Sequence, residues 1–294
     1  VFFRAGAQYA LVSPVVEEQF YRRFLERFER NGESGRVLLA HERLLNMAKE
    51  RGNEAEVARR TSAMLNRFGQ YVSEGVVVST RGRRAAALAD QPRIIAQFEA
   101  FSTGETTGDE ASDGLLIKGK QEALPAFIEE AKAYGERYGV FDSLALYRYL
   151  DGAASLYNAD LIYSYDCPAN YDEEQCDAFM EIIYEQVYPL ADAAQAYAIQ
   201  RFLFVGDLAD KMGQHNVWVT KAADVLNSLD PFTYPTEKVA ELATPVVLEL
   251  PAVAPYKLQP VLPEPQPEPV VPMNDVQQQD VEPVVPEVED DTPE

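Results

Sequence analysis

Apolar residues recur at helical spacing along most of this 294-residue chain, which restricts it to a mainly helical fold. Val16, Phe20, Phe24 and Phe28 follow one another at four-residue intervals, with charged residues between them. This spacing predicts an amphipathic helix. The same pattern recurs in further segments: 36–51, 54–68, 84–101, 121–138, 194–208 and 216–229. Only the runs 75–79 and 245–248 look like strands, and both are short, so the sequence predicts an all-α fold.

Helices joined by short turns indicate antiparallel helix pairs. The apolar pattern repeats at about 35 residues, and periods of this length mark solenoids, in which each helix pair buries its apolar face against its neighbours. We therefore expect an α-solenoid of degenerate repeats over residues 1–250. The segment 102–114 is rich in serine, threonine, glycine and acidic residues, and we expect it to be a surface loop.

The composition changes sharply at Pro251. Residues 251–294 hold 11 of the 19 prolines, and their acidic residues outnumber the basic ones by ten to one. Proline fixes φ and removes a backbone donor, so closely spaced prolines block both helix and sheet. Few apolar side chains, together with charge repulsion, cannot offset the entropy of ordering such a segment. We expect a disordered tail of partly polyproline II character, whose role as solubiliser, spacer or docking strand stays open.

The chain carries 48 acidic and 26 basic residues, a net charge of −22. This excess of acid argues against nucleic-acid binding, which needs a basic surface. No apolar run approaches the roughly 20 residues of a membrane-spanning helix. The first residue is Val1 rather than Met, so we interpret the chain as processed or cropped, with no targeting signal visible in it.

Residues for a catalytic centre are scarce, since the chain has only two His and two Cys. His41-Glu42 begins like a zinc-protease motif, but the second His is missing. We therefore expect no catalytic residue, no metal and no cofactor, and a role in binding other proteins. The alternative is an enzyme on a helical scaffold that uses a carboxylate pair, although nothing in the sequence marks a particular pair.

Residues 3–9 carry Gly6 and Tyr9 at positions where the tetratricopeptide repeat has a small and an aromatic side chain. Together with residues 21–28 they resemble the two helices of such a repeat. Glu17 departs from the pattern, because a small alanine is expected there. The resemblance implies that the expected solenoid is tetratricopeptide-like, built of antiparallel helix pairs that bind other proteins.

Several motifs within residues 120–235 follow one another in a set order: Asp166-Cys167-Pro168, Asp172 to Asp177, Tyr188-Pro189-Leu190 with Ala194, His215 to Trp218, and Val225 to Pro231. Their order and spacing are similar to those of large bacterial envelope-associated tetratricopeptide proteins. Some of those proteins are tied to gliding-motility complexes that span the periplasm. The resemblance implies a scaffold and interaction role in a cell-envelope complex, without catalysis.

Cys167 and Cys176 bracket a short loop. Their spacing differs from the CxxC of thioredoxin-like redox pairs, and a zinc site would need two further ligands. We favour a structural disulfide, with inert free thiols or a metal site as the alternatives. A disulfide would place the protein in an oxidising compartment, in agreement with a periplasmic or envelope location. Reduced cysteines would instead fit a cytosolic adaptor or holdase.

Residues 149–200 contain no Lys or Arg, ten acidic residues and eight of the 16 tyrosines. Helix capping plus a solvated acidic face is one interpretation, and a calcium site is another. The third is a surface for a basic or extended segment of a partner protein, because tyrosine supplies contact area at low entropy cost. Oligomeric state does not follow from the sequence. The candidate partner-binding residues, expected to line one groove of the solenoid, are Tyr147, Tyr149, Tyr157, Tyr163 and Tyr165.

Overall fold

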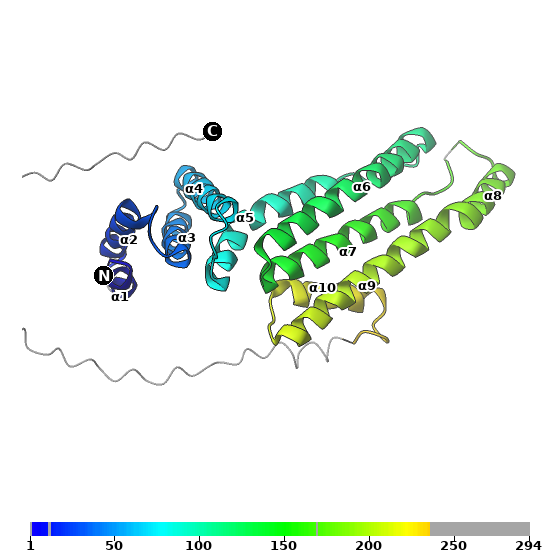
Figure 1. The fold of residues 1–294 in the computed structure, drawn as a ribbon. Coiled ribbons are helices and arrows are strands. Elements are labelled where there is room, and N and C mark those ends of the chain that lie inside the picture. Colours follow the sequence, from blue (N-terminus) through cyan, green and yellow to red (C-terminus); the bar gives the residue numbers. More distant parts are fainter. Residues whose placement is uncertain (1, 11–12, 169, 236–294) are drawn as a thin grey trace, which may run out of the picture. The chain divides into compact units, whose positions relative to one another are not determined.

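The computed structural model describes residues 2–10, 13–168 and 170–235, which belong to one unit, Val1–Pro245. Every regular element in these ranges is a helix, so the predicted all-α class is confirmed there, and the run 75–79 is irregular. The predicted tail, 251–294, and the run 245–248 lie outside the described residues. The elements in Figure 1 are α1 (Phe2–Tyr9), α2 (Pro14–Phe28), α3 (Ser34–Glu50), α4 (Glu54–Ser73), α5 (Thr80–Phe101), α6 (Glu110–Tyr138), α7 (Phe141–Tyr163), α8 (Glu173–Ile182), the π-helical turn η1 (Ile183–Val187), α9 (Tyr188–Met212) and α10 (Val217–Leu229).

Side-chain caps and glycines set the helix ends. The Asn53 side chain accepts a hydrogen bond from the Glu56 N–H at 3.0 Å and so starts α4. Gly139 and Gly213, directly after α6 and α9, adopt left-handed φ values of +55° and +58°. Residues with a side chain rarely tolerate this conformation, so the two helices end there and the chain turns back.

The loop expected at 102–114 is shorter than predicted, because α6 already begins at Glu110. Asp109 caps its first turn by accepting a hydrogen bond from the Ser112 N–H at 2.9 Å. The buried carboxylate of Asp113 then accepts two backbone N–H groups of the preceding loop. The acidic residues that made this segment look like a loop are therefore the N-terminal signal of a helix.

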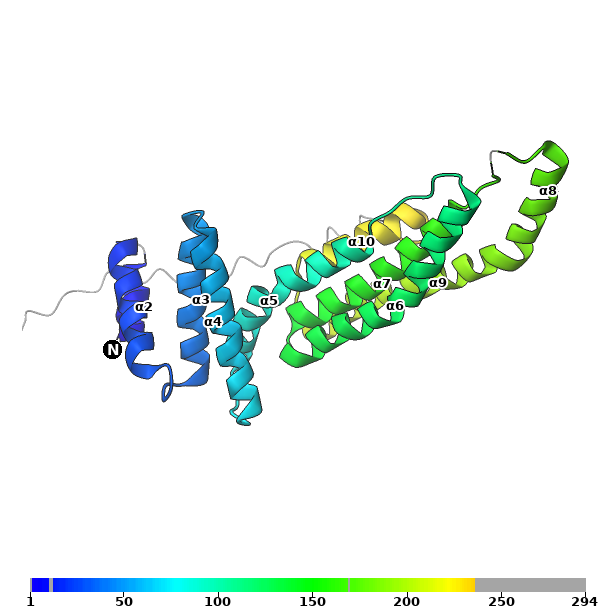
Figure 2. The same cartoon turned by 90° about the horizontal axis from the view of Figure 1, so that it is seen from above.

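Most helices pack on their neighbour in the chain, and alternate helices also meet, since α3 contacts α5, α5 contacts α7, and α7 contacts α9. Figures 1 and 2 show this succession of helix pairs from two sides. One apolar core runs through the contacts, with Phe68, Leu146 and Phe202 among its fully buried members. Trp218 also belongs to this core, with 7% of its surface exposed, and packs on Tyr149. This packing sets α3 beside α5, two helices that are not adjacent in the chain.

Candidate functional site

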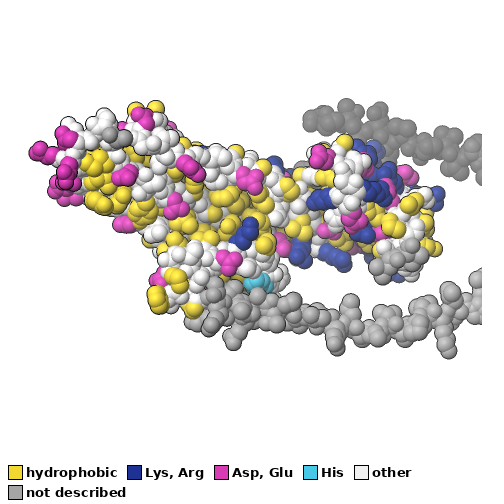
Figure 3. Space-filling view, turned by 180° about the vertical axis from the view of Figure 1, so that it is seen from behind, with side chains coloured by type: hydrophobic (Ala, Val, Ile, Leu, Met, Phe, Trp, Pro, Cys, Tyr) yellow, Lys and Arg dark blue, Asp and Glu magenta, His cyan; other side chains and the backbone are white. Residues whose placement is uncertain are grey.

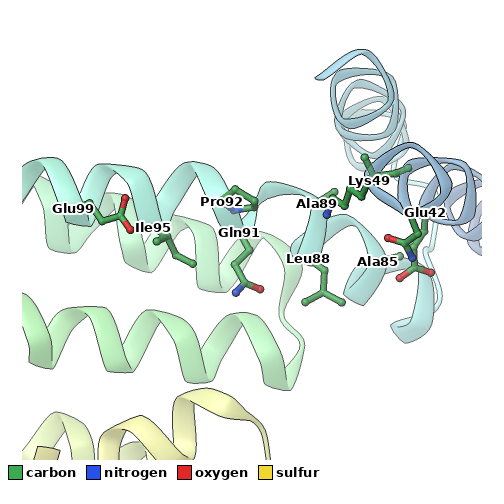
Figure 4. A pocket seen from close by; sticks show the side chains of 11 residues that line it. Glu42, Lys49, Ala85, Leu88, Ala89, Gln91, Pro92, Ile95 and Glu99 are labelled. Atoms are coloured by element: carbon green, nitrogen blue, oxygen red, sulfur yellow. The ribbon is translucent and has the colours of Figure 1, made fainter. Parts of the chain in front are cut away.

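Helices α3 and α5 line a groove of about 620 Å³, within the size range of ligand sites. One face of α3 borders it, since helical residues three, four and seven apart project to the same side. In Figure 4, Leu88, Gln91 and Ile95 project to one side of α5. The contribution of α3 consists of Glu42, Leu45, Asn46 and Lys49.

The floor of the groove is apolar. Leu45, Ala85 and Ala89 line it and are at most 5% exposed. The short alanine side chains leave room for the backbone of a bound chain to come close to α5. Leu88 stands at the edge with 38% of its surface exposed, so an apolar side chain from outside can be buried against it.

Two side-chain amides border this floor, those of Asn46 and Gln91. Neither forms a side-chain hydrogen bond within the described part of the chain. Each amide can donate two hydrogen bonds and accept others at its oxygen. A peptide backbone offers the complementary groups, one N–H and one C=O per residue.

Pro92 interrupts the hydrogen-bond ladder of α5 beside the same groove. Proline has no N–H, so the carbonyl of Leu88, four residues earlier, loses its partner within the helix. The groove thus combines an apolar floor with one backbone acceptor and two amides that have no partner. These groups are suited to binding an extended segment of another chain.

The charges on the groove are few. Glu42 and Glu99 contribute acidic groups, and Lys49 contributes a basic one. Burial raises the pKa of the Glu42 carboxyl, and the positive charges of Arg81, Arg84 and Lys49 oppose part of that rise. With two acids and one base, the groove favours a segment that is neutral or carries one positive charge.

Outside the groove, three buried carboxylates each form an ion pair with an arginine. Burial raises the pKa of Asp151, and the facing Arg201 lowers it in part. Because each acid has its own ion-pair partner, none of the three offers a free group for acid–base chemistry. The pairs are Glu17 with Arg43, Asp90 with Arg93, and Asp151 with Arg201.

The five predicted tyrosines lie outside this groove, and the first two belong to the main core. Tyr147 is 6% exposed, because α6 and α7 approach closely at Gly135. Tyr149 packs on Phe202 and on Trp218. Neither side chain therefore presents its ring face to a partner in this structure.

The other three tyrosines lie against a second, smaller apolar cluster. Tyr157 donates its hydroxyl hydrogen to backbone carbonyls of Thr103 and Gly104. Tyr163 donates to Asp192 at 2.5 Å, and Tyr165 packs on the ring of Phe179. Tyr157 also packs against the main core, so the five tyrosines are spread over both clusters, and a role for them in partner binding stays a prediction.

Cys167 and Cys176 lie at disulfide distance, with their Cα atoms 5.6 Å apart. This separation is within the range that disulfides span and agrees with the predicted bond. Between them, Asp172 and Gln175 form a reciprocal capping box that begins α8. The bond therefore ties the first turn of α8 to the chain that follows α7.

Within the described ranges, no group of three or more His, Cys, Asp or Glu side chains is arranged to hold a metal ion. Among the helices α1 to α10, none is both long and apolar enough to cross a membrane.

Sequence reasoning missed the groove, although Pro92 within a helical pattern was a visible signal of an open backbone carbonyl. The other half of the site comes from α3, and only the packing of α3 on α5 brings the two faces together. Comparison with models of protein families, with curated proteins and with solved structures finds no match for this chain.

Proposed function

We propose that this protein is a non-catalytic interaction scaffold that binds an extended segment of a partner protein in the groove between α3 and α5. One observation carries the proposal: two side-chain amides without a hydrogen bond in the described residues, together with a proline that breaks the ladder of α5, border an apolar floor. Burying the apolar edge at Leu88 contributes affinity, and pairing Asn46 and Gln91 with a backbone fixes the direction of the bound segment.

The arrangement of helices supports a tetratricopeptide-like α-solenoid. Its support is the packing of α3 on α5, α5 on α7 and α7 on α9, in addition to the contacts between consecutive helices. In solenoids, such stacking of alternate helices builds an extended binding surface. A groove between two alternate helices is where that surface is expected.

We assign the scaffold to a complex of the bacterial cell envelope, on the periplasmic side. Disulfides persist in oxidising compartments, and Cys167 and Cys176 lie at disulfide distance. The motifs shared with envelope-associated tetratricopeptide proteins support the same location and a role related to motility complexes.

The test places a photo-crosslinking amino acid at Ile95, which lines the groove, in the full chain expressed in its native cells. The matched control carries the same group at Val77, which is 89% exposed and lies outside the groove. We expect an adduct of defined mass from position 95 that position 77 does not form. A second chain combines the crosslinker with Leu88→Asp, which puts a charge on the apolar edge and is expected to abolish the adduct.

Circular dichroism and thermal melting check that the Leu88→Asp chain keeps its fold. An adduct that forms equally at both positions, or that survives Leu88→Asp in a folded chain, would show that the groove does not bind the partner.

A further inference from the structure

Charge is distributed unevenly along the described helices. Residues 1–101 carry 16 basic and 12 acidic residues, a net charge of +4, whereas residues 102–235 carry 8 basic and 23 acidic residues, a net charge of −15. Figure 3 shows basic side chains gathered over the N-terminal helices and acidic ones gathered around α8. Two copies of the chain can therefore attract each other through unlike regions.

The basic region contains a row of arginines, here called the basic stripe: Arg23 and Arg27 on α2, and Arg30 two residues past the end of that helix. Glu29, between Phe28 and Arg30, keeps a helical conformation, so the spacing of four and three residues places the three arginines on one side. All three are exposed, and within the described residues none forms an ion pair. Nearby arginines such as Arg22 and Arg43 are already paired with glutamates. The basic stripe thus has no acidic partner in the described part of the fold, although the Arg27 guanidinium lies over the ring of Phe2, 5.0 Å from its centroid.

The acidic region contains a matching row on α8, here called the acidic stripe: Glu174, Asp177 and Glu181. These side chains are exposed and unpaired within the described part of the chain, and α8 buries none of its own residues. Among the other elements, α8 packs mainly on the turn η1 that follows it. One side of α8 therefore has no partner in the fold.

The two stripes match when the helices run antiparallel. From Glu174 the acidic stripe advances by three and then four residues, and from Arg30 the basic stripe goes back by three and then four. Glu174 then faces Arg30, Asp177 faces Arg27, and Glu181 faces Arg23.

The same register continues for one more step beyond the charges. Tyr184 lies three residues after Glu181, and Phe20 lies three residues before Arg23. Tyr184 is 60% exposed, which makes it one of the exposed large aromatic side chains of the described region. Phe20 is half-buried and stacks on Tyr9, so the part of its ring that stays exposed is what Tyr184 can reach at this step.

We propose that the basic stripe of one copy docks antiparallel on the acidic stripe of a second copy. The contact joins unlike surfaces, so each copy keeps one free stripe and the assembly grows as an open chain of copies. Exposed ion pairs contribute little each, so the association is weak and strongly dependent on salt. It uses neither face of the α3–α5 groove and goes beyond the proposed function.

The test follows the association of the full chain by sedimentation velocity over a wide range of protein concentrations. At about 0.01 M salt, where the screening length is about 30 Å, we expect the average mass to rise with concentration. At about 1 M salt, where that length falls to about 3 Å, the same samples are expected to be monomeric. This comparison needs no variant, so it does not depend on whether a variant folds.

Charge reversal then locates the contact. The triple variant Arg23→Glu, Arg27→Glu and Arg30→Glu and the triple variant Glu174→Lys, Asp177→Lys and Glu181→Lys are each expected to weaken self-association by about tenfold or more. Mixed together, the two variants again present opposite charges at both contacts, so association is expected to return.

The matched control for the acidic-stripe variant reverses three exposed acids outside the stripe, Asp207→Lys, Asp210→Lys and Asp224→Lys, with the same change in net charge as that variant. It is expected to associate as well as the unchanged chain or better, since repulsion between copies falls. A monomeric chain at low salt, association unaffected by salt, an equal loss in the control, or no recovery in the mixture would each overturn the proposal.

Discussion

Arg43 donates two hydrogen bonds to the carboxylate of Glu17, at 2.5 and 3.1 Å, and the Glu17 side chain has no exposed surface. The pair joins α2 to α3 across the core. Removing one partner leaves a buried charge without compensation, whereas replacing both by apolar side chains often costs little. We therefore expect Arg43→Met to lower the free energy of unfolding by about 3 kcal/mol.

The double variant Glu17→Leu, Arg43→Met is expected to recover most of that loss, and urea denaturation measures both. Arg36 is the control, because its pair with Glu33 is exposed on both sides and Arg36→Met is expected to change stability by less than about 1 kcal/mol. Equal losses of unfolding free energy for Arg43→Met and Arg36→Met would show that the buried pair contributes no more to stability than the exposed pair.

Substituting alanine for either of two glycines in α6 is expected to change the stability of the fold in opposite directions. A Cβ added at Gly135 would lie 2.9 Å from the Tyr147 Cβ, whereas one added at Gly119 would meet no atom within 4 Å. We expect Gly135→Ala to destabilise the fold by about 1–3 kcal/mol by forcing α6 and α7 apart. Gly119→Ala is expected to stabilise it by about 1 kcal/mol, because alanine favours the helix. Thermal unfolding of the two variants measures the difference, and a shift of the same sign in both would contradict it.

Reduction of the Cys167–Cys176 bond is expected to act locally. The bond joins residues nine apart in the chain, and closing a loop of this length stabilises by about 2.5–3 kcal/mol in the chain-entropy model. Because α8 buries none of its residues, this contribution is large relative to its packing. We expect amide hydrogen exchange in α8 to become about 100-fold faster after reduction.

Amides of α10, which packs on α7 and α9, provide the internal control and are expected to keep their exchange rates. Unchanged exchange in α8 would mean that the bond does not hold this helix in place. Mass spectrometry of the non-reduced protein establishes first that the pair is oxidised.

The Tyr163 hydroxyl predicts a loss of stability at high pH. Burial raises the pKa of Tyr163 to about 12, and its hydrogen bond to the Asp192 carboxylate adds to the rise. Since free tyrosine has a pKa of about 10, the unfolded chain releases this proton first as pH increases. The protonated Tyr163 hydroxyl therefore makes its full contribution to the free energy of unfolding below about pH 10, and this contribution disappears as pH passes about 12.

Ultraviolet titration follows the ionisation, and Tyr163→Phe identifies its part of the signal. Asp192→Asn removes the negative charge but leaves the burial, so we expect the pKa of Tyr163 to fall only part of the way towards 10. A titration curve that is identical in the unchanged chain and in Asp192→Asn would count against the role of Asp192.

Local patterns were sufficient for the helical class and for many helix ends, because periodicity and caps depend on nearby residues. The segment around Phe20 and Phe24 was predicted as a helix for this reason, and it forms α2. The tyrosines show the limit of such reasoning. A tyrosine next to an acidic segment looks like a surface residue, but Tyr147 is buried because Gly135, in a different helix, leaves room for its ring.

The groove could not be predicted from the sequence for a related reason. Asn46 and Gln91 are 45 positions apart in the chain, and neither has a local feature that marks a site. Their meeting depends on α3 packing against α5, which is a property of the whole stack of helices. The capping acids at Asp109 were misread for the opposite reason, since a local helix signal was hidden in a composition typical of loops.

Helix α5 gives the groove a mechanical property. It packs on α3 and α4 and also on α6 and α7, and Pro92 removes one of its internal hydrogen bonds midway. A helix bends most easily where its ladder is broken, so a load between the two groups of helices is taken up at Pro92. Because Pro92 and Leu88 also line the groove, bending at this point is expected to change the width of the groove.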